Sequence, residues 1–235
     1  WGATKPLFDQ DIAKLDQFLL TGGNLLIALN PDLNQDRLAN MRKMLKRHGI
    51  TIHNDLVIDQ GNFVRGSNGT VPLVTNFNQE HPITKKISGQ IFFPLTSSIE
   101  VEVKSNNPTK KIEYQQLVTT SPFPKSWADK TPKEIAKGGL TYTKGRDTKG
   151  PITLTVAAEY PADKKRPNGG RLVALGNSSL VNNSYANFYT NFQLIINSLS
   201  WLVGDDSLIS FNLPVMRQEP IFISQQQLGV VFYLS

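Results

Sequence analysis

The most informative stretch of the chain is Gly169-Gly170-Arg171-Leu172-Val173-Ala174-Leu175-Gly176-Asn177-Ser178-Ser179. Its centre, from Leu172 to Leu175, is wholly apolar, which is typical of a strand buried on both faces of a parallel sheet. The turn-forming residues from Gly176 onward end this strand. Ligands of open α/β sheets usually bind at such turns, so the stretch indicates both a fold and a place for a site.

A helix with one apolar face is predicted beyond this turn. Apolar residues recur there at steps of three and four, which is the helical period: Phe188, Phe192, Ile195, Leu199 and Leu202. Gly204 and the two aspartates after it end the helix. Strand, polar turn and helix together make half of a βαβ unit.

The N-terminal part of the chain also alternates between predicted helices and strands. An amphipathic helix is predicted over residues 9–20, closed by Gly22-Gly23, and an apolar strand follows over residues 25–29. Asn30-Pro31-Asp32 is the turn after that strand, and a second helix ends at His48-Gly49. This alternation predicts an α/β fold with a mostly parallel, doubly wound, Rossmann-like sheet flanked by helices.

The domain organisation follows from composition. Residues 1–213 are expected to form a single α/β domain, and residues 214–235 a polar and then apolar tail. Residues 128–168 carry many Lys, Gly and Pro and are expected to be a β-rich insertion of loops and a hairpin. The apolar run over residues 228–234 is too short to cross a bilayer, which needs about 20 such residues.

Two segments resemble the membrane-anchored auxiliary components of ABC transport systems, the group that includes the gliding-motility protein GldG. One is Gly170 to Ser178 with Asn191, Asn197 and Trp201-Leu202, and the other runs from Leu15 through Gly22-Gly23 to Pro31. The resemblance implies a fold similar to class I glutamine amidotransferases. It also implies an extracytoplasmic, periplasmic domain, a membrane segment beyond the C-terminus, and partners in the ABC permease and ATPase.

Composition excludes several kinds of chemistry. The 235 residues include no cysteine, so disulfides, thiolate metal sites and a cysteine nucleophile are excluded, including the nucleophile of the amidotransferases that the fold resembles. The formal net charge is +6, but the basic residues are scattered and not interleaved with aromatics, so no nucleic-acid partner is expected. No phosphate-binding loop is present, and no cofactor is expected.

Candidates for catalysis are weak. Ser121 and Ser178 each follow a predicted strand, but neither lies in the glycine pattern of a nucleophile elbow. His48 and His53 lack any metal-binding spacing, so no metal site is expected. The chain is therefore expected not to be an enzyme, and a degenerate hydrolase is kept as an alternative.

A polar rim is predicted at the carboxyl ends of the strands, where a small ligand or a partner loop would bind. It comprises Asn30, Asp32, Ser121, Asn177, Ser178 and Ser179. Trp127, in a proline-rich stretch, is expected to be an exposed partner contact. The leading hypothesis is a non-catalytic domain that binds other proteins of a transporter or its cargo. The alternative from another class is a module that binds a carbohydrate or peptide.

Overall fold

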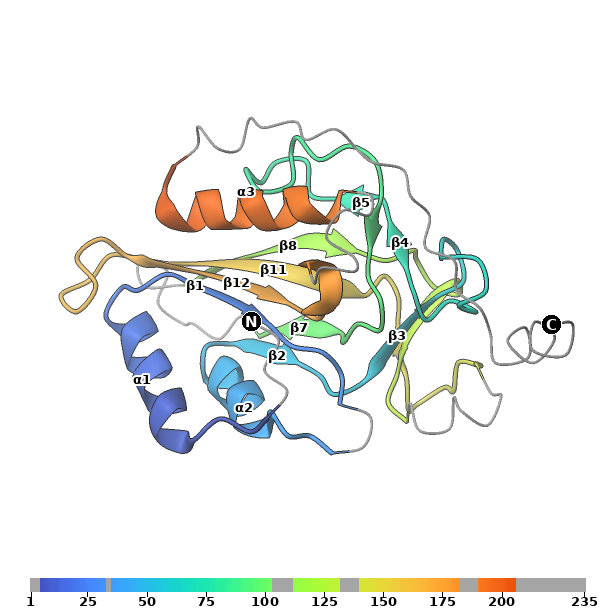
Figure 1. The fold of residues 1–235 in the computed structure, drawn as a ribbon, viewed down its shortest axis with the longest axis horizontal. Helices are drawn as coiled ribbons and strands as arrows, with labels where there is room; N and C mark the ends of the chain where they lie inside the picture. The colour runs from blue at the N-terminus through green and yellow to red at the C-terminus, as the bar shows by residue number, and fades with distance from the viewer. Residues whose placement is uncertain (1–4, 33–34, 103–111, 132–139, 182–189, 206–235) are drawn as a thin grey trace, which may run out of the picture.

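The structure is a computed structural model that describes residues 5–32, 35–102, 112–131, 140–181 and 190–205. Within these residues a curled sheet separates two layers of helices (Figure 1). α3 (Asn191–Val203) covers one face, and α1 (Asp9–Leu20) with α2 (Ala39–Arg47) covers the other. The molecule is therefore an α/β domain with a central sheet.

The main sheet contains seven of the described strands. Its order is β1 (Leu25–Ala28), β12 (Gly170–Leu175), β11 (Thr153–Tyr160), β7 (Ile99–Val101) and β2 (Ile50–Ile52). β8 (Glu113–Thr119) also pairs with β11, and β5 (Asn76–Phe77) pairs with β8. β11 is the central strand, because it hydrogen-bonds to β12 on one side and to β8 and β7 on the other.

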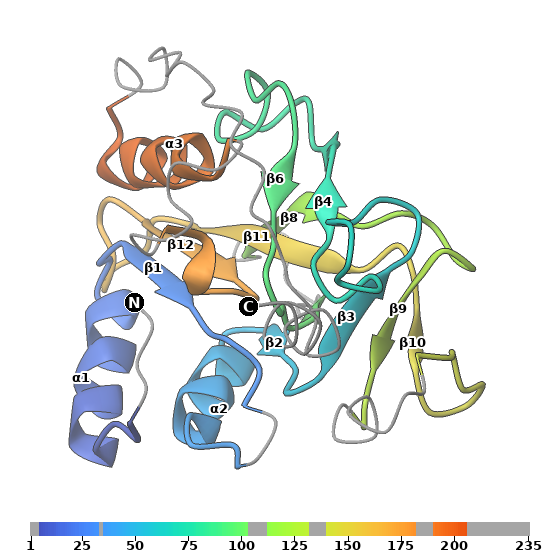
Figure 2. The ribbon, with the colours of Figure 1, turned by 45° about the vertical axis from the view of Figure 1, so that its right-hand side comes forward.

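Two small sheets flank the main one (Figure 2). One has the order β10 (Thr148–Lys149), β9 (Ser126–Asp129) and β3 (Leu56–Asp59), and the other pairs β4 (Leu73–Val74) with β6 (Ile91–Phe92). β3, β4 and β6 consist mainly of buried apolar residues, as expected for strands between turns, whereas both residues of β10 are exposed.

The strand side chains alternate between two cores, as the period of two requires. In β12, Val173 and Leu175 face the core under α3, whereas Leu172 and Ala174 face the core under α1 and α2. These four side chains are fully buried. The continuous apolar run in the sequence is thus explained by burial on both faces.

The expectation of a mostly parallel, doubly wound sheet is wrong. Within the described chain β1 and β12 are the parallel pair, with Leu25 opposite Leu172, and the other pairs of the main sheet are antiparallel. A parallel pair needs a long crossover, usually a helix. No helix is described between β2 and β12, and strands that are joined without such a crossover pair in the antiparallel sense.

Residues 128–168, which were expected to be a β-rich insertion, contribute to the main sheet. This range contains β11, the strand on which the main sheet is centred. The residues on either side of β11 are polar and rich in glycine, and they resemble a loop region. The eight residues of β11 nevertheless pair with three neighbouring strands. The expected tail, residues 214–235, lies outside the described residues.

The outer helix α3 is oriented differently from the prediction. Ile195 and Leu202 are buried as expected, but Phe192 is 41% exposed and Leu199 is 43% exposed. Buried polar side chains take part of the inward face, among them Asn191 and Asn197. Phe188 lies outside the described residues. An apolar stripe of this helix is consequently left facing solvent.

Candidate functional site

The polar rim forms where the two parallel strands end. Asn30 follows β1 and Ser178 follows β12, and the register that pairs Ala28 with Leu175 brings these turns together. Asn30 Oδ1 accepts a hydrogen bond from Ser178 N at 2.6 Å, and its Nδ2 donates to Ser179 Oγ at 3.1 Å. These three predicted residues therefore form one cluster at the carboxyl edge of the sheet.

Asn177 belongs to the same turn but points into the protein. Its side chain is fully buried and donates to the carbonyl oxygens of Pro94 at 2.5 Å and Leu95 at 3.0 Å, while its Oδ1 accepts from Leu180 N. Leu95 has a φ of +54°, a conformation that non-glycine residues rarely adopt. Asn177 thus holds a neighbouring loop and presents no group to a ligand.

Asp32 is occupied by its own loop. Its Oδ2 accepts from Arg37 Nε at 2.7 Å, and its carboxylate also accepts from the backbone N–H groups of Gln35 and Arg37. The Arg37 guanidinium holds the pKa of Asp32 far below its usual range, against the opposing effect of burial. Asn54 fixes the backbone of Asp32 through two further hydrogen bonds. The carboxylate is ionised and paired.

Ser121 lies in a different environment from the rest of the predicted rim. Its backbone N–H donates to Asp59 Oδ2 at 2.9 Å, and it lines a small cavity of about 210 Å³ together with Asp59, Asn76 and Thr119. No hydrogen bond in the described structure joins Ser121 to Asn30, Asp32 or residues 177–179. The structure therefore divides the predicted rim into two parts.

The histidines of the chain are not placed beside these serines. Nε2 of His48 lies 2.6 Å from Asp16 and that of His53 lies 3.1 Å from Glu100, while the His81 ring packs edge-on against Trp201. Neither Ser121 nor Ser178 has a hydrogen bond to a histidine in the described structure. Within the same residues, no group of three or more His, Asp and Glu side chains is gathered as metal ligands.

Arg42, on α2, fixes the backbone around the rim, and no sequence motif marks it. Its side chain is only 9% exposed. Its guanidinium donates to the carbonyl oxygens of Asn30, Ile52 and His53 at 2.8 to 3.0 Å, and it pairs with Asp36. A basic residue in a helical pattern otherwise resembles a solvated one, so no sequence signal marked it.

The expectation that Trp127 is exposed is wrong. Trp127 lies in β9, is 3% exposed and packs with Leu56 and Ile58 of β3. The prolines before it suggested a loop, but residues 126–129 form a fully buried strand. A contact between the Trp127 side chain and a partner would require the residues packed against it, such as Leu140 and Tyr142, to move away.

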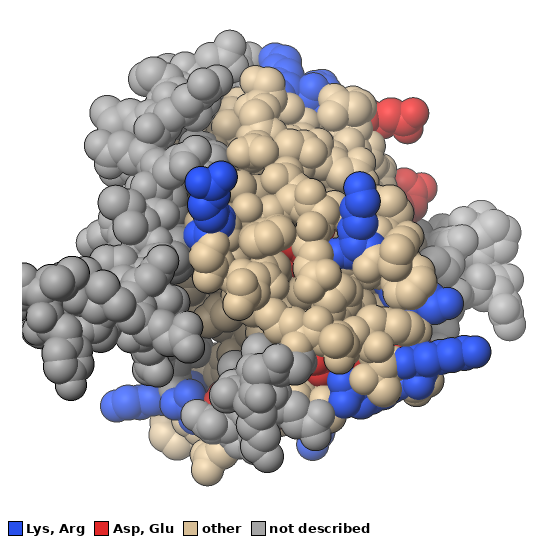
Figure 3. Space-filling model, turned by 90° about the vertical axis from the view of Figure 1, so that its right-hand side faces the viewer, with Lys and Arg blue, Asp and Glu red and all other residues tan. Residues whose placement is uncertain are grey.

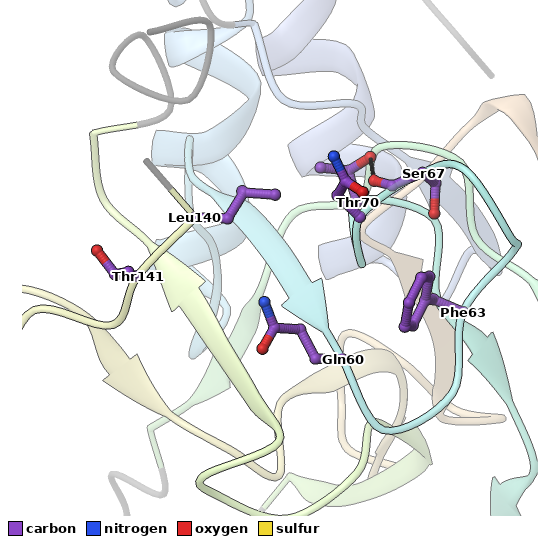
Figure 4. Close-up of a pocket in the computed structure, with 7 residues that line it drawn as sticks. Gln60, Phe63, Ser67, Thr70, Leu140 and Thr141 are labelled. Atoms are coloured by element: carbon purple, nitrogen blue, oxygen red, sulfur yellow. Dashed lines mark hydrogen bonds between the residues drawn. The ribbon is translucent and has the colours of Figure 1, made fainter. Parts of the chain in front are cut away.

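The structure also shows a larger cavity, of about 680 Å³, which lies outside the expected rim (Figure 4). One wall is the loop that follows β3, and the other wall is formed by Leu140 and Thr141. Five of its lining residues, from Gln60 to Thr70, belong to a polar loop rich in Asn and Gly. That loop is in fact closed by hydrogen bonds, such as Val64 N to Val71 O at 3.0 Å.

Charge is spread thinly over the side of the molecule that lies at the right of Figure 1. Figure 3 shows some Lys and Arg side chains standing apart on a broad uncharged area and others lying closer together toward the lower right, with few acidic side chains among them. Among the described residues, no helix is both long enough and apolar enough to span a bilayer.

Comparison with known proteins identifies relatives at the level of family and fold. The family model described as an ABC-type uncharacterized transport system matches residues 2–200. The structure is similar to the mmIFT52 N-terminal domain, with a TM-score of 0.55 and 17% identity over 91% of this chain and 76% of that one. A weaker similarity, with a TM-score of 0.41, links it to a ThuA-like protein from Bacteroides uniformis, at 16% identity over 85% of this chain and 66% of that one. No curated protein sequence matches.

Proposed function

Because the chain belongs to the family of ABC-type transport system auxiliary proteins, we propose that it is a non-catalytic, extracytoplasmic domain that binds the transporter or its cargo. The observation that carries this proposal is the family match over residues 2–200. The domain would be held at the periplasmic face of the inner membrane by a segment beyond residue 235. ATP would be hydrolysed by a separate subunit.

The outer surface of α3 supports a role in protein contact. Phe192, Leu199 and Val203 are 41%, 43% and 71% exposed, and the half-buried Ile196 lies between them. Their spacing of four, three and four residues places them on one stripe of the helix. Contiguous exposed apolar side chains of this kind mark interaction surfaces more often than scattered ones do.

The chemistry of the rim supports the non-catalytic part of the proposal. The side chains of Asn30, Asp32 and Asn177 are engaged in hydrogen bonds that hold loops together. Ser121 and Ser178 have no histidine base beside them in the described structure. A general base must lie within hydrogen-bond reach of the proton that it accepts.

The proposal is tested by purifying the full-length protein from its native membrane in mild detergent and identifying what accompanies it. We expect the ABC permease and ATPase to be recovered, and recovery to fall when Leu199→Lys is introduced into the α3 stripe. The matched control is Leu20→Lys on α1, since Leu20 is also 43% exposed but lies in the opposite helical layer.

Each outcome of the co-purification bears on a different part of the proposal. Recovery of the wild-type protein without any transporter subunit would contradict the auxiliary role. Equal recovery with both lysine variants would remove α3 from the contact while leaving the association intact. Digestion of the domain by protease added to intact spheroplasts tests the periplasmic location, and resistance before lysis would place the domain on the other side.

A further inference from the structure

The cavity of about 680 Å³ has the size of a small-molecule site, since such sites usually enclose about 300 to 1,000 Å³. Figure 4 shows the labelled side chains from both walls arranged around a common space at the end of β3. Gln60 stands at the base of this space, with Phe63 on one side and Leu140 and Thr141 on the other.

The polar groups that line the cavity are amides and hydroxyls, and no charged side chain is among its described lining residues. The amides belong to Gln60 and Asn68, and the hydroxyls to Ser67, Thr70 and Thr141. Each amide or hydroxyl group offers both donors and acceptors. The side chains of Gln60, Asn68 and Thr141 make no hydrogen bond to another described residue, so their capacity is available to a ligand.

Apolar surface completes the lining. Phe63 is half-buried, and its backbone is fixed by a bridge to Pro72. Leu140 is packed against the cluster of Leu56, Ile58 and Trp127. Packing therefore anchors the Leu140 side chain, and the ring of Phe63, on its fixed backbone, offers a flat apolar face beside the polar groups.

The wall that carries Gln60 and Asn68 is held in shape by hydrogen bonds within the loop and to the segment around Ser121 and Lys125. Asp59, which is 1% exposed, accepts from Gly61 N at 2.8 Å and from Ser121 N at 2.9 Å, and Gln60 N donates to Lys125 O at 2.7 Å. Asn68 has a φ of +52° in a turn closed by Thr70 N to Ser67 O. A wall that is already ordered reduces the entropy lost on binding.

We propose that this cavity binds an uncharged saccharide. Sugar hydroxyls both donate and accept, as do the amides and hydroxyls of the wall, and the C–H face of a sugar ring fits against the flat face of Phe63. A phosphate or carboxylate ligand would need cationic partners, which the described lining lacks. An extended peptide would need a row of free backbone groups. In this loop the N–H groups of Val64, Ser67 and Thr70 already donate to carbonyl oxygens of the loop itself.

The inference is tested with the purified protein on a printed array of neutral and acidic glycans, followed by calorimetric titration of the best neutral glycan. Gln60→Ala and Phe63→Leu should each weaken binding by about tenfold, which corresponds to about 1.4 kcal/mol. Gln60 is exposed, so its replacement does not threaten folding, and leucine preserves much of the apolar volume of Phe63. Gln116→Ala, an exposed amide on β8, is the matched control.

Several outcomes would overturn the proposal: no binding to any neutral glycan, binding only to acidic glycans, or binding that survives both cavity variants. Capture of an unstructured peptide that Gln60→Ala abolishes would assign the cavity to peptides instead. None of these results depends on whether a permease accompanies the protein, so this site and the proposed transporter association can fail independently.

Discussion

Lys130 Nζ lies 2.7 Å from Oδ2 of Asp55, a carboxylate that is only 1% exposed. Asp55 also accepts hydrogen bonds from the backbone N–H and the hydroxyl of Ser98, at 2.8 and 2.6 Å. Asp55 precedes β3 and Ser98 precedes β7, so this buried carboxylate connects a small sheet to the main sheet. Lys130, just after β9, supplies the charge that balances it.

Replacing this lysine should destabilise the domain. Lys130→Met leaves the Asp55 carboxylate buried without its cation, and removal of one partner of a fully buried pair costs about 3 to 5 kcal/mol. Because the Lys130 side chain is 28% exposed, we expect a smaller loss of unfolding free energy, of about 1 to 3 kcal/mol. Denaturant titration measures it.

The exposed Lys125, in the same segment, provides the control: Lys125→Met should change stability by no more than about 0.5 kcal/mol. Adding Asp55→Asn to Lys130→Met should recover part of the loss, since the unpaired charge is then gone. Strictly additive effects of the two substitutions would show that the ion pair has no coupling energy.

Arg42 should not be replaceable by lysine. Lysine keeps the charge, but its single ammonium cannot reach three carbonyl oxygens and Asp36 in the geometry of the guanidinium. We expect Arg42→Lys to lower the free energy of unfolding by about 2 kcal/mol and to lower the melting temperature accordingly. Arg65→Lys, at an exposed loop position, should leave both unchanged; equal stability of the two variants would refute the central role of Arg42.

Asn191 should be essential for the position of α3. Its Oδ1 accepts from Phe92 N at 2.8 Å, and its Nδ2 donates to the carbonyl oxygens of Phe92 and Leu180. Asn191→Ala leaves these buried backbone groups unsatisfied, at a cost of about 2 to 3 kcal/mol. Thermal unfolding measures the loss against Gln116→Ala. A melting temperature equal to that of the control would show that water or another side chain replaces the amide.

Stability should depend on pH through His81. Burial lowers the pKa of His81 from 6.5 to about 4. The unfolded chain therefore binds a proton between these two values that the folded chain does not, so stability is complete above pH 6.5 and falls as the pH drops toward 4. The expected loss is roughly 3 kcal/mol.

An NMR titration of the three histidines checks this directly. The His81 ring should remain neutral until the pH approaches 4, and a midpoint near 6.5 would contradict the prediction. The loss of stability on protonation of His81 can be separated from the loss that follows protonation of the paired carboxylates. Asp163, for example, has its pKa lowered to about 2 by Arg166, so its contribution to stability is lost only below the His81 range.

Sequence reasoning predicted the elements whose side chains obey a local period. The helix over residues 9–20 and the strands at Leu25 and Leu172 are confirmed, because their apolar patterns reflect burial on one or two faces. Pairing direction was not predictable in this way. A largely buried strand such as Thr153–Tyr160 has the same pattern in a parallel or an antiparallel sheet, and only its partner strands distinguish the two.

The site was predicted only where the parallel pairing of β1 with β12 determines it. Asn30 and Ser178 were expected together and are together. Ser121 was placed with them because it also follows a strand, although its environment is set by Asp59, which is distant in the sequence. The large cavity is formed by Gln60 and Thr141, residues on separate segments with no shared motif, so no local pattern could indicate it.

The pairing of β1 with β12 has a consequence for the synthesis of the protein. β1 leaves the ribosome before the other described strands of the main sheet, and Leu172, the partner of Leu25, follows only after nearly all of these strands have been made. Until then the apolar edge of β1 has no strand beside it, and unpaired edges promote association between nascent chains. We expect the N-terminal segment to depend on a chaperone during translation, and chains that terminate before residue 172 to aggregate.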